Sequence, residues 1–107
     1  MNIVNKNGCL VVSFDKYIDE DNVEDFKKEI DAAYSQSASK DMVFDLSDSK
    51  AISDKAVGMT LGRYKRVLEN DGQMYIAGAK GDVDKTLSNM DVYKVIPSYK
   101  NVKDIIM

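Results

Sequence analysis

Short apolar runs alternate with amphipathic stretches along the chain, and this alternation limits the folds open to it. Runs of strand length lie at 1–4, 9–14, 42–46, 74–77 and 93–96, and stretches with helical spacing lie between most of them. The order β-β-α-β-α-β-α-β-α predicts an α/β fold. We expect a mostly parallel sheet of four to five strands, an N-terminal hairpin and about four helices, the last in 101–107.

Turn and capping residues mark the ends of these elements. The pair Asn7-Gly8 between two apolar runs predicts a hairpin, because both residues tolerate positive φ. Asp21 and Glu24 have the spacing of a capping box, so the first helix is expected over 22–36. Ser53 or Asp54 is expected to cap the second helix.

The second helix carries an apolar stripe and two internal glycines. We expect the stripe to face the core; it consists of Val57, Leu61, Tyr64 and Leu68. Gly58 and Gly62 each cost about 1 kcal/mol in a helix relative to alanine. That cost predicts a close approach of this helix to the sheet.

The composition argues against most kinds of catalytic, metal-binding and nucleic-acid-binding site. The 107 residues include no histidine and a single cysteine, Cys9, which is expected in the core, and the formal net charge is -3. We therefore expect no His-based catalysis, no metal site, no cofactor and no direct nucleic-acid binding. No phosphate-binding glycine loop and no membrane-inserting run is present, so the sequence predicts one cytoplasmic domain over 1–107 that is not an enzyme.

One segment stands out as a docking site. Residues 51–58 connect the carboxyl end of the strand at 42–46 to the start of the second helix. In open α/β sheets this edge is where ligands and partners dock. A helix start also responds to added negative charge, which suits a phosphorylation switch.

From about Val4 to Ile106 the chain resembles the STAS domain of bacterial anti-sigma factor antagonists. Three segments carry the resemblance, together with Ile18-Asp19: LGRYK at 61–65, DGQM at 71–74 and VYKVI at 92–96. The resemblance implies the STAS fold and a non-enzymatic, protein-binding role in transcription regulation.

Several positions depart from the family pattern. The family motif D-S-S-G-L-G aligns with 53–58, which places Ser53 at the aspartate, Asp54 at the first serine and Lys55 at the serine that a partner kinase phosphorylates. Gly58 is kept, and Asp91 replaces a loop glycine. Because lysine cannot accept a phosphoryl group on oxygen, the usual partner switch is not expected here.

The resemblance implies a partner and a binding surface. The partner is an anti-sigma factor, a serine kinase of the histidine-kinase-like ATPase type, or a related protein, and its capture frees a sigma factor. The surface consists of Asp19, Ser53, Asp54 and Lys55, with Met59 and Arg63 as lesser candidates. Either the chain binds this partner permanently, or its partner is not an anti-sigma kinase.

Further alternatives remain open at this stage. Ser53 is a weaker candidate for the phosphorylated residue, against its simpler role as a helix cap. The chain is alternatively a STAS subunit that docks on the ATPase of a membrane transport complex. A small nucleotide-binding domain and a weak homodimer are also considered.

Overall fold

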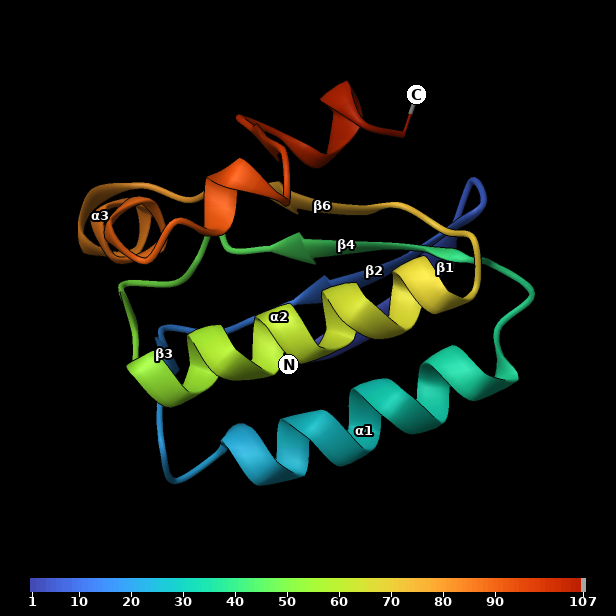
Figure 1. Ribbon diagram of the computed structural model, residues 1–107, viewed down its shortest axis with the longest axis horizontal. Coiled ribbons are helices and arrows are strands. Elements are labelled where there is room, and N and C mark those ends of the chain that lie inside the picture. The colour runs from blue at the N-terminus through green and yellow to red at the C-terminus, as the bar shows by residue number, and fades with distance from the viewer. Residues whose placement is uncertain (107) are drawn as a thin grey trace.

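A computed structural model describes residues 1–106 of the chain (Figure 1). Its strands and helices run in this order: β1 Asn2–Lys6, β2 Cys9–Ser13, β3 Tyr17–Ile18, α1 Val23–Gln36, β4 Asp41–Asp45, β5 Ala51–Ile52, α2 Asp54–Glu69, β6 Met74–Ala77, α3 Gly81–Asn89, η1 Val92–Lys94, β7 Ser98–Tyr99 and η2 Val102–Asp104. The elements η1 and η2 are single 3₁₀ turns. The helix expected in 101–107 extends to Met107, which lies outside the described residues.

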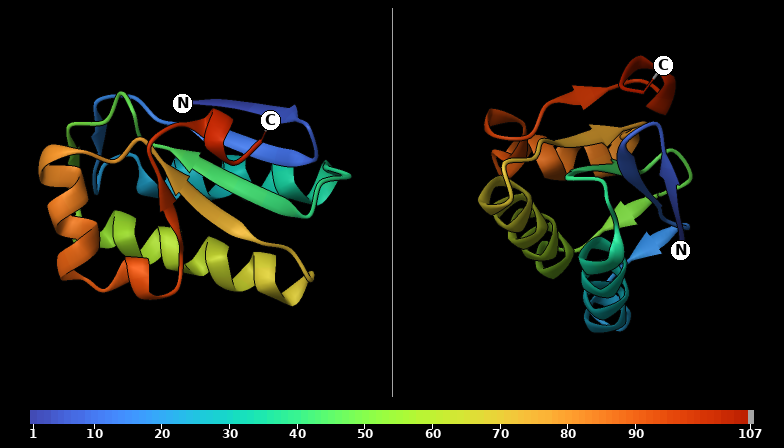
Figure 2. Two further views of the ribbon diagram at one scale, coloured as in Figure 1. Left: turned by 90° about the horizontal axis from the view of Figure 1, so that it is seen from above. Right: turned by 90° about the vertical axis from the view of Figure 1, so that its right-hand side faces the viewer.

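Five strands form one sheet in the order β1-β2-β4-β6-β7. Strand β1 runs antiparallel to β2, and the other neighbours are parallel. Each crossover moves the chain one strand further in the same direction, so right-handed connections place α1 and α2 on the same face. Figure 2 shows these two helices beneath the sheet and the C-terminal segment above it. The predicted α/β fold and its N-terminal hairpin are confirmed.

Apolar side chains fill both sides of the sheet. The larger core lies between the sheet and the helices and includes Leu10, Phe14, Phe44 and Ile76. The smaller core lies under the C-terminal segment, where Ile106 packs against a cluster with Cys9. Cys9 is buried as predicted, and burial raises the pKa of its thiol, with a smaller contribution from Asp41.

The turn prediction is confirmed and one cap prediction is wrong. Asn7 and Gly8 have φ of 49° and 85°, as a tight turn between antiparallel strands requires. Helix α1 does not use the predicted capping box, because its N-cap is Asn22, which makes no side-chain cap. The Asn22 side chain instead accepts a hydrogen bond from the Asp19 amide at 2.9 Å.

The strand predicted at 93–96 is wrong. Val92 and Ile96 are both fully buried, and the Ile96 amide donates to the Val92 carbonyl at 2.9 Å. Apolar residues four apart pack on the same side of a helical turn, which explains why this run forms η1. The last strand, β7, follows Pro97 instead.

The core-facing stripe predicted on α2 is confirmed in part. Val57 is buried and Leu61 and Tyr64 pack against the main core, whereas Leu68 is exposed. The fully buried residues of the helix are Ala56, Val57, Met59, Thr60 and Val67. Gly58 and Gly62 lie on the exposed side, and a Cβ added at either would meet nothing within 4 Å. They therefore do not mark a close approach to the sheet.

Candidate partner-binding site

A second, two-stranded sheet lies beyond the carboxyl ends of β2 and β4. Strands β3 and β5 pair in parallel, with Tyr17 opposite Ala51 and Ile18 opposite Ile52. The Ser53 amide continues the ladder by donating to the Ile18 carbonyl at 2.9 Å. This pairing brings Asp19 beside Ser53, so two candidates far apart in the sequence share one surface.

Ser53 is the N-cap of α2. Its Oγ accepts a hydrogen bond from the Ala56 amide at 3.1 Å, and its backbone is extended. This contact confirms the predicted cap. Asp54 follows as the first helical residue, is exposed, and places a carboxylate at the positive end of the helix dipole.

Lys55 lies one position further into the helix and makes a loose ion pair. Its Nζ is 3.6 Å from Oε1 of Glu24 on α1, and the two side chains are 49% and 57% exposed. Exposed pairs of this kind contribute about 0–1 kcal/mol. A partner can therefore take over the Lys55 ammonium at little cost to this chain.

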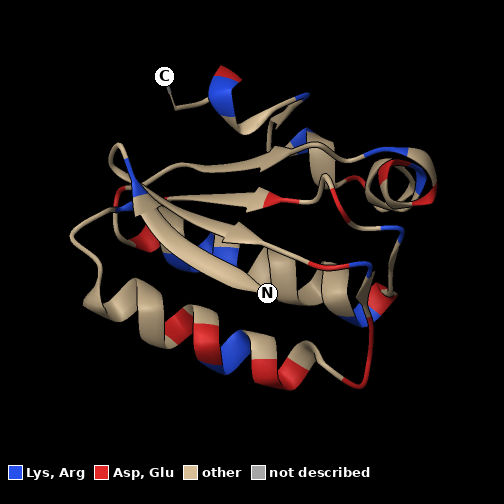
Figure 3. Ribbon diagram, turned by 180° about the vertical axis from the view of Figure 1, so that it is seen from behind, with Lys and Arg blue, Asp and Glu red and all other residues tan. Residues whose placement is uncertain are grey.

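Acidic residues are concentrated on the segment that contains Glu24. The loop before α1 and the first turns of α1 carry a run of carboxylates (Figure 3), which includes Asp19, Glu20, Asp21, Glu24 and Asp25. The Asp19 carboxylate is held in place, since its Oδ1 accepts from the Asp21 amide at 3.0 Å.

The structure places Met59 and Arg63, the lesser candidates, away from the exposed candidate surface. Met59 is 4% exposed and belongs to the main core. The Arg63 side chain is 12% exposed, and its Nε lies 3.1 Å from Oδ1 of Asp31 on α1. Both residues lie on the side of α2 that faces the sheet or α1, so neither side chain is presented to a partner.

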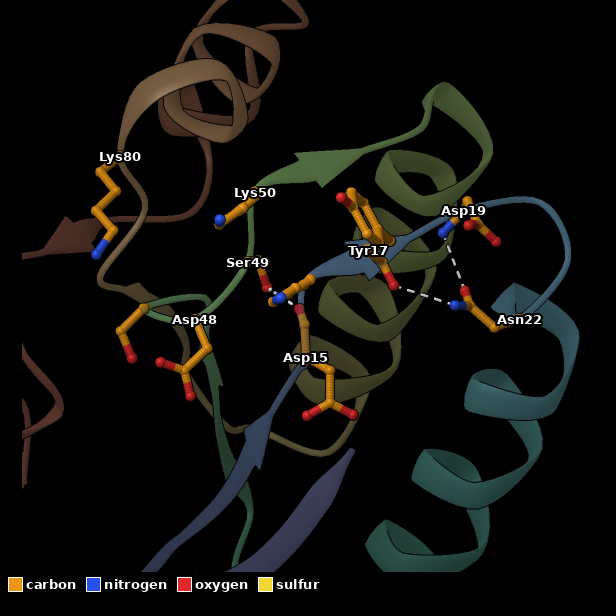
Figure 4. Close-up of a pocket in the computed structure, with 10 residues that line it drawn as sticks. Asp15, Tyr17, Asp19, Asn22, Asp48, Ser49, Lys50 and Lys80 are labelled. Carbon is orange, nitrogen blue, oxygen red and sulfur yellow. Dashed lines mark hydrogen bonds between the residues drawn. The ribbon is translucent and has the colours of Figure 1, made fainter.

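Beside the remaining candidates lies a hollow of about 820 Å³ that sequence reasoning missed (Figure 4). It is open to solvent and is lined by residues of the loops after β2, β4 and β6, by β3, and by Asp19 and Asn22 of the turn after β3. The lining includes Asp19, already a candidate, and Lys16, Tyr17, Lys50 and Lys80. The available signal was topological, because the carboxyl ends of parallel strands meet at one edge of the sheet.

A sequence model of the STAS domain matches residues 1–105. The chain belongs to the STAS domain family. This STAS domain is 23% identical over 94 residues to an anti-sigma F factor antagonist of Paenibacillus polymyxa, an alignment that covers 88% of this chain and 80% of that protein.

Solved structures share the fold at low identity. An anti-sigma factor antagonist from Mycobacterium paratuberculosis is 17% identical with a TM-score of 0.86, covering 96% of this chain and 86% of that one. The antagonist SpoIIAA in its unphosphorylated form is 16% identical with a TM-score of 0.83, covering 97% and 91%. The phosphorylated form of Bacillus SpoIIAA is 15% identical with a TM-score of 0.73, covering 97% and 95%. Among residues 1–106, no helix has both the length and the apolar character needed to cross a membrane.

Proposed function

We propose that this STAS domain is an anti-sigma factor antagonist that binds its partner without a serine phosphorylation switch. The antagonist role is supported by the Paenibacillus polymyxa relative, an anti-sigma F factor antagonist by name. The lack of a switch is carried by one observation, the exposed Lys55 at the second position of α2. The proposal takes the whole of 1–107 as one regulatory domain that acts by binding and not by catalysis.

The charge at Lys55 distinguishes such a protein from an antagonist whose binding is controlled by serine phosphorylation. A phosphoserine at this position would add roughly -1.5 to -2 charges at neutral pH. Lysine fixes one positive charge there instead, and no kinase that transfers phosphate to hydroxyl groups can change it. The surface formed by Asp19, Ser53, Asp54 and Lys55 therefore keeps one charge state, and capture of the anti-sigma factor is permanent.

Ser53 offers the one competing site for phosphorylation on this surface. Its hydroxyl already accepts from the Ala56 amide, yet it retains a hydrogen and is partly exposed. The phosphorylation state of Ser53 is therefore part of the test.

The test is capture of the partner by tagged protein from its own cell lysate, with and without ATP, followed by mass spectrometry of partner and bait. We expect an anti-sigma factor of the histidine-kinase-like ATPase type and no phosphate on the bait. A Lys55→Ser variant treated in the same way is expected to acquire phosphate at position 55. Recovery of a transporter ATPase, or phosphate on Ser53 of the unmodified chain, would contradict the proposal.

Reversing the charge at Lys55 measures its share of binding. Lys55→Glu places a carboxylate beside Glu24 and is expected to weaken the captured partner's affinity about 100-fold, or ~2.7 kcal/mol. Isothermal titration measures the affinity, and urea unfolding is expected to show a change in stability within about 0.5 kcal/mol. Lys103→Glu, the same charge change on the C-terminal segment, is the matched control. Equal affinity of Lys55→Glu and wild type would remove Lys55 from the binding surface.

A further inference from the structure

Strand β1 forms an uncovered edge of the main sheet. It is the first strand in the order β1-β2-β4-β6-β7, and among the described residues it pairs with β2 alone. The left-hand view of Figure 2 shows β1 along one border of the sheet, with no element beyond it. The outer side of β1 is therefore open to pairing with a further strand.

The two edges of the sheet differ in how they are protected against such pairing. Strand β7, at the other edge, has only the two residues Ser98–Tyr99 and directly follows Pro97. Short length and proline are two means by which natural edge strands avoid pairing. Strand β1 has five residues and no proline, and its register with β2 is continuous, so it has no bulge. Its one charged side chain, Lys6, lies at its end.

The hairpin turn determines which backbone groups of β1 point outward. Lys6 and Cys9 flank the two-residue turn, so they form a hydrogen-bonded pair. In an antiparallel ladder such pairs alternate with non-hydrogen-bonded ones. The amides and carbonyls of Ile3 and Asn5 therefore point away from β2. Within residues 1–106, no backbone hydrogen bond from a loop or another element reaches either residue.

The outward groups limit the ways in which two copies of β1 can pair about a two-fold axis. Outward groups must face outward groups, which leaves registers centred on Ile3, Val4 or Asn5. The register centred on Ile3 sets Asn5 against Met1, which lies outside the strand. The register centred on Asn5 sets Ile3 against Asn7, whose φ of 49° belongs to the turn. In the Val4 register all five residues of each strand face the other strand, and Ile3 of each copy exchanges hydrogen bonds with Asn5 of the other.

The side chains of β1 suit the Val4 register. Val4 is 44% exposed and lies at the centre of the strand, so the two-fold axis brings two exposed valines together as a cross-strand pair. Lys6 then lies opposite the neutral amide of Asn2 in the other copy. No like charges are directly opposed, and the strand is complementary to itself.

Contacts with the rest of the chain hold β1 in place before any pairing. Ile3 packs against the main core, and Asn5 Oδ1 accepts hydrogen bonds from the hydroxyls of Ser37 and Ser39, at 2.6 and 3.2 Å. These contacts use side chains and do not involve the outward amides and carbonyls. The strand therefore needs little reordering to bind a second copy.

We infer that two copies of this chain pair through β1, antiparallel and about a two-fold axis at Val4. The two five-stranded sheets then form one continuous sheet, and both copies contribute the same groups to the interface. A five-residue edge is small against the roughly 1,000 Å² of a stable interface, so we expect a weak dimer with a dissociation constant of about 0.1 mM. The inference is independent of the proposed function, because it concerns the chain without its partner.

The first test removes an outward amide. Sedimentation velocity of the wild type is expected to show a monomer–dimer equilibrium between about 10 µM and about 1 mM. Asn5→Pro deletes an amide that does not bond to β2, so the β1–β2 ladder remains and dimerisation is expected to weaken at least about tenfold. Asn5→Ala, the matched control, loses the same side-chain contacts, keeps the amide and is expected to dimerise like the wild type. A monomeric wild type at the highest concentration, or equal dimerisation of the two variants, would overturn the inference.

The second test examines the register by charge exchange. Val4→Lys and Val4→Glu each set like charges across the two-fold axis, and each is expected to be monomeric, with urea unfolding to show that it is folded. An equimolar mixture of the two is expected to regain the dimer, because opposite charges then face each other. Val95→Lys and Val95→Glu, at a valine that is 45% exposed and lies outside the sheet, are the controls and are expected to dimerise normally. A mixture of the folded Val4 variants that stays monomeric would contradict the register.

The third test traps the pair covalently. Opposed residues of a non-hydrogen-bonded antiparallel pair have Cα atoms about 4.5 Å apart, within disulfide range, so Val4→Cys is expected to form a covalent dimer on mild oxidation. Lys6→Cys alone is not expected to crosslink, whereas its mixture with Asn2→Cys is. The native Cys9 is buried and serves as the internal control in the wild type. A wild type that dimerises while Val4→Cys stays uncrosslinked would show that the dimer uses another surface, and the inference would fail.

Discussion

Lys55 and Arg63 lie on the same helix about two turns apart, and their surroundings are opposite. Arg63 is 12% exposed and its Nε lies 3.1 Å from Asp31, which Arg66 Nη1 also approaches at 3.1 Å. Lys55 is 49% exposed and lies 3.6 Å from Glu24. One cation is enclosed between α1 and α2, whereas the other is available to a molecule outside.

The difference separates a residue that builds the fold from a residue proposed to contact a partner. Arg63 belongs to the LGRYK run by which the chain resembles its family, and the structure gives it an internal role. Lys55 stands where the family resemblance places the phosphorylated serine, and its exposed pair contributes little to the fold. A match to a family motif therefore does not by itself mark the partner surface.

Removing Asp31 is the largest expected disturbance of the fold. Asp31→Ala leaves the enclosed Arg63 guanidinium without a carboxylate, and we expect a loss of about 2 kcal/mol in unfolding free energy. Urea denaturation measures the loss. Glu29→Ala, an exposed residue of the same helix without an ion pair within the described chain, is expected to change stability by at most about 0.5 kcal/mol.

Partner binding distinguishes the two cations further. At a temperature where Asp31→Ala remains folded, we expect its affinity for the captured anti-sigma factor to match that of the wild type. An affinity loss as large as that of Lys55→Glu would show that the α1–α2 ion pair also shapes the partner surface, and the contrast between the two regions would fail.

Ser53→Ala comes next in size. It removes the acceptor of the Ala56 amide, and the cost is about 1 kcal/mol of stability. Ser53→Asp restores an acceptor at the cap and is expected to recover most of that loss. Thermal unfolding of both variants tests the cap. An unchanged melting temperature for Ser53→Ala would mean that water or a neighbouring group replaces the hydroxyl.

Local sequence signals gave most of the fold. The hairpin at Asn7-Gly8 and the cap at Ser53 depend on neighbouring residues only, and both are confirmed. The strand predicted at 93–96 is wrong because a short run of apolar and amphipathic residues fits a strand and a helical turn equally well. Burial of Val92 and Ile96 against the core favours the helical turn over the strand, and that packing is not visible in the sequence.

Local sequence signals likewise account for only one part of the candidate site. Its start at Ser53, Asp54 and Lys55 follows from a strand-to-helix connection that the sequence shows. The β3–β5 pairing and the hollow require three loops to meet at one edge, which only the topology determines. Met59 and Arg63 belong to the surface that the family resemblance implies, and that resemblance does not tell which side of α2 faces the sheet and α1.

Asp91 is a further departure from the family pattern, and here the replacement has a conformational cost. Asp91 follows the C-cap of α3, has φ of 61° and donates its amide to the Ser88 carbonyl at 3.1 Å. Glycine is the preferred residue at this left-handed position, and a carboxylate at a helix C-terminus is unfavourable. The exposed pair of Asp91 with Lys94, at 3.3 Å, offsets little of this.

Asp91→Gly is therefore expected to raise the unfolding free energy by about 0.5 kcal/mol and to leave partner affinity unchanged. Asp71→Gly, at a second left-handed position with φ of 62°, is expected to act in the same direction. Asp82→Gly in the first turn of α3 is the opposing control, with an expected loss of up to about 1 kcal/mol. If Asp91→Gly is instead destabilising, its carboxylate does more for the fold than the Lys94 pair indicates. Asp91 would then resemble Arg63 more than Lys55, as a charge that the fold itself requires.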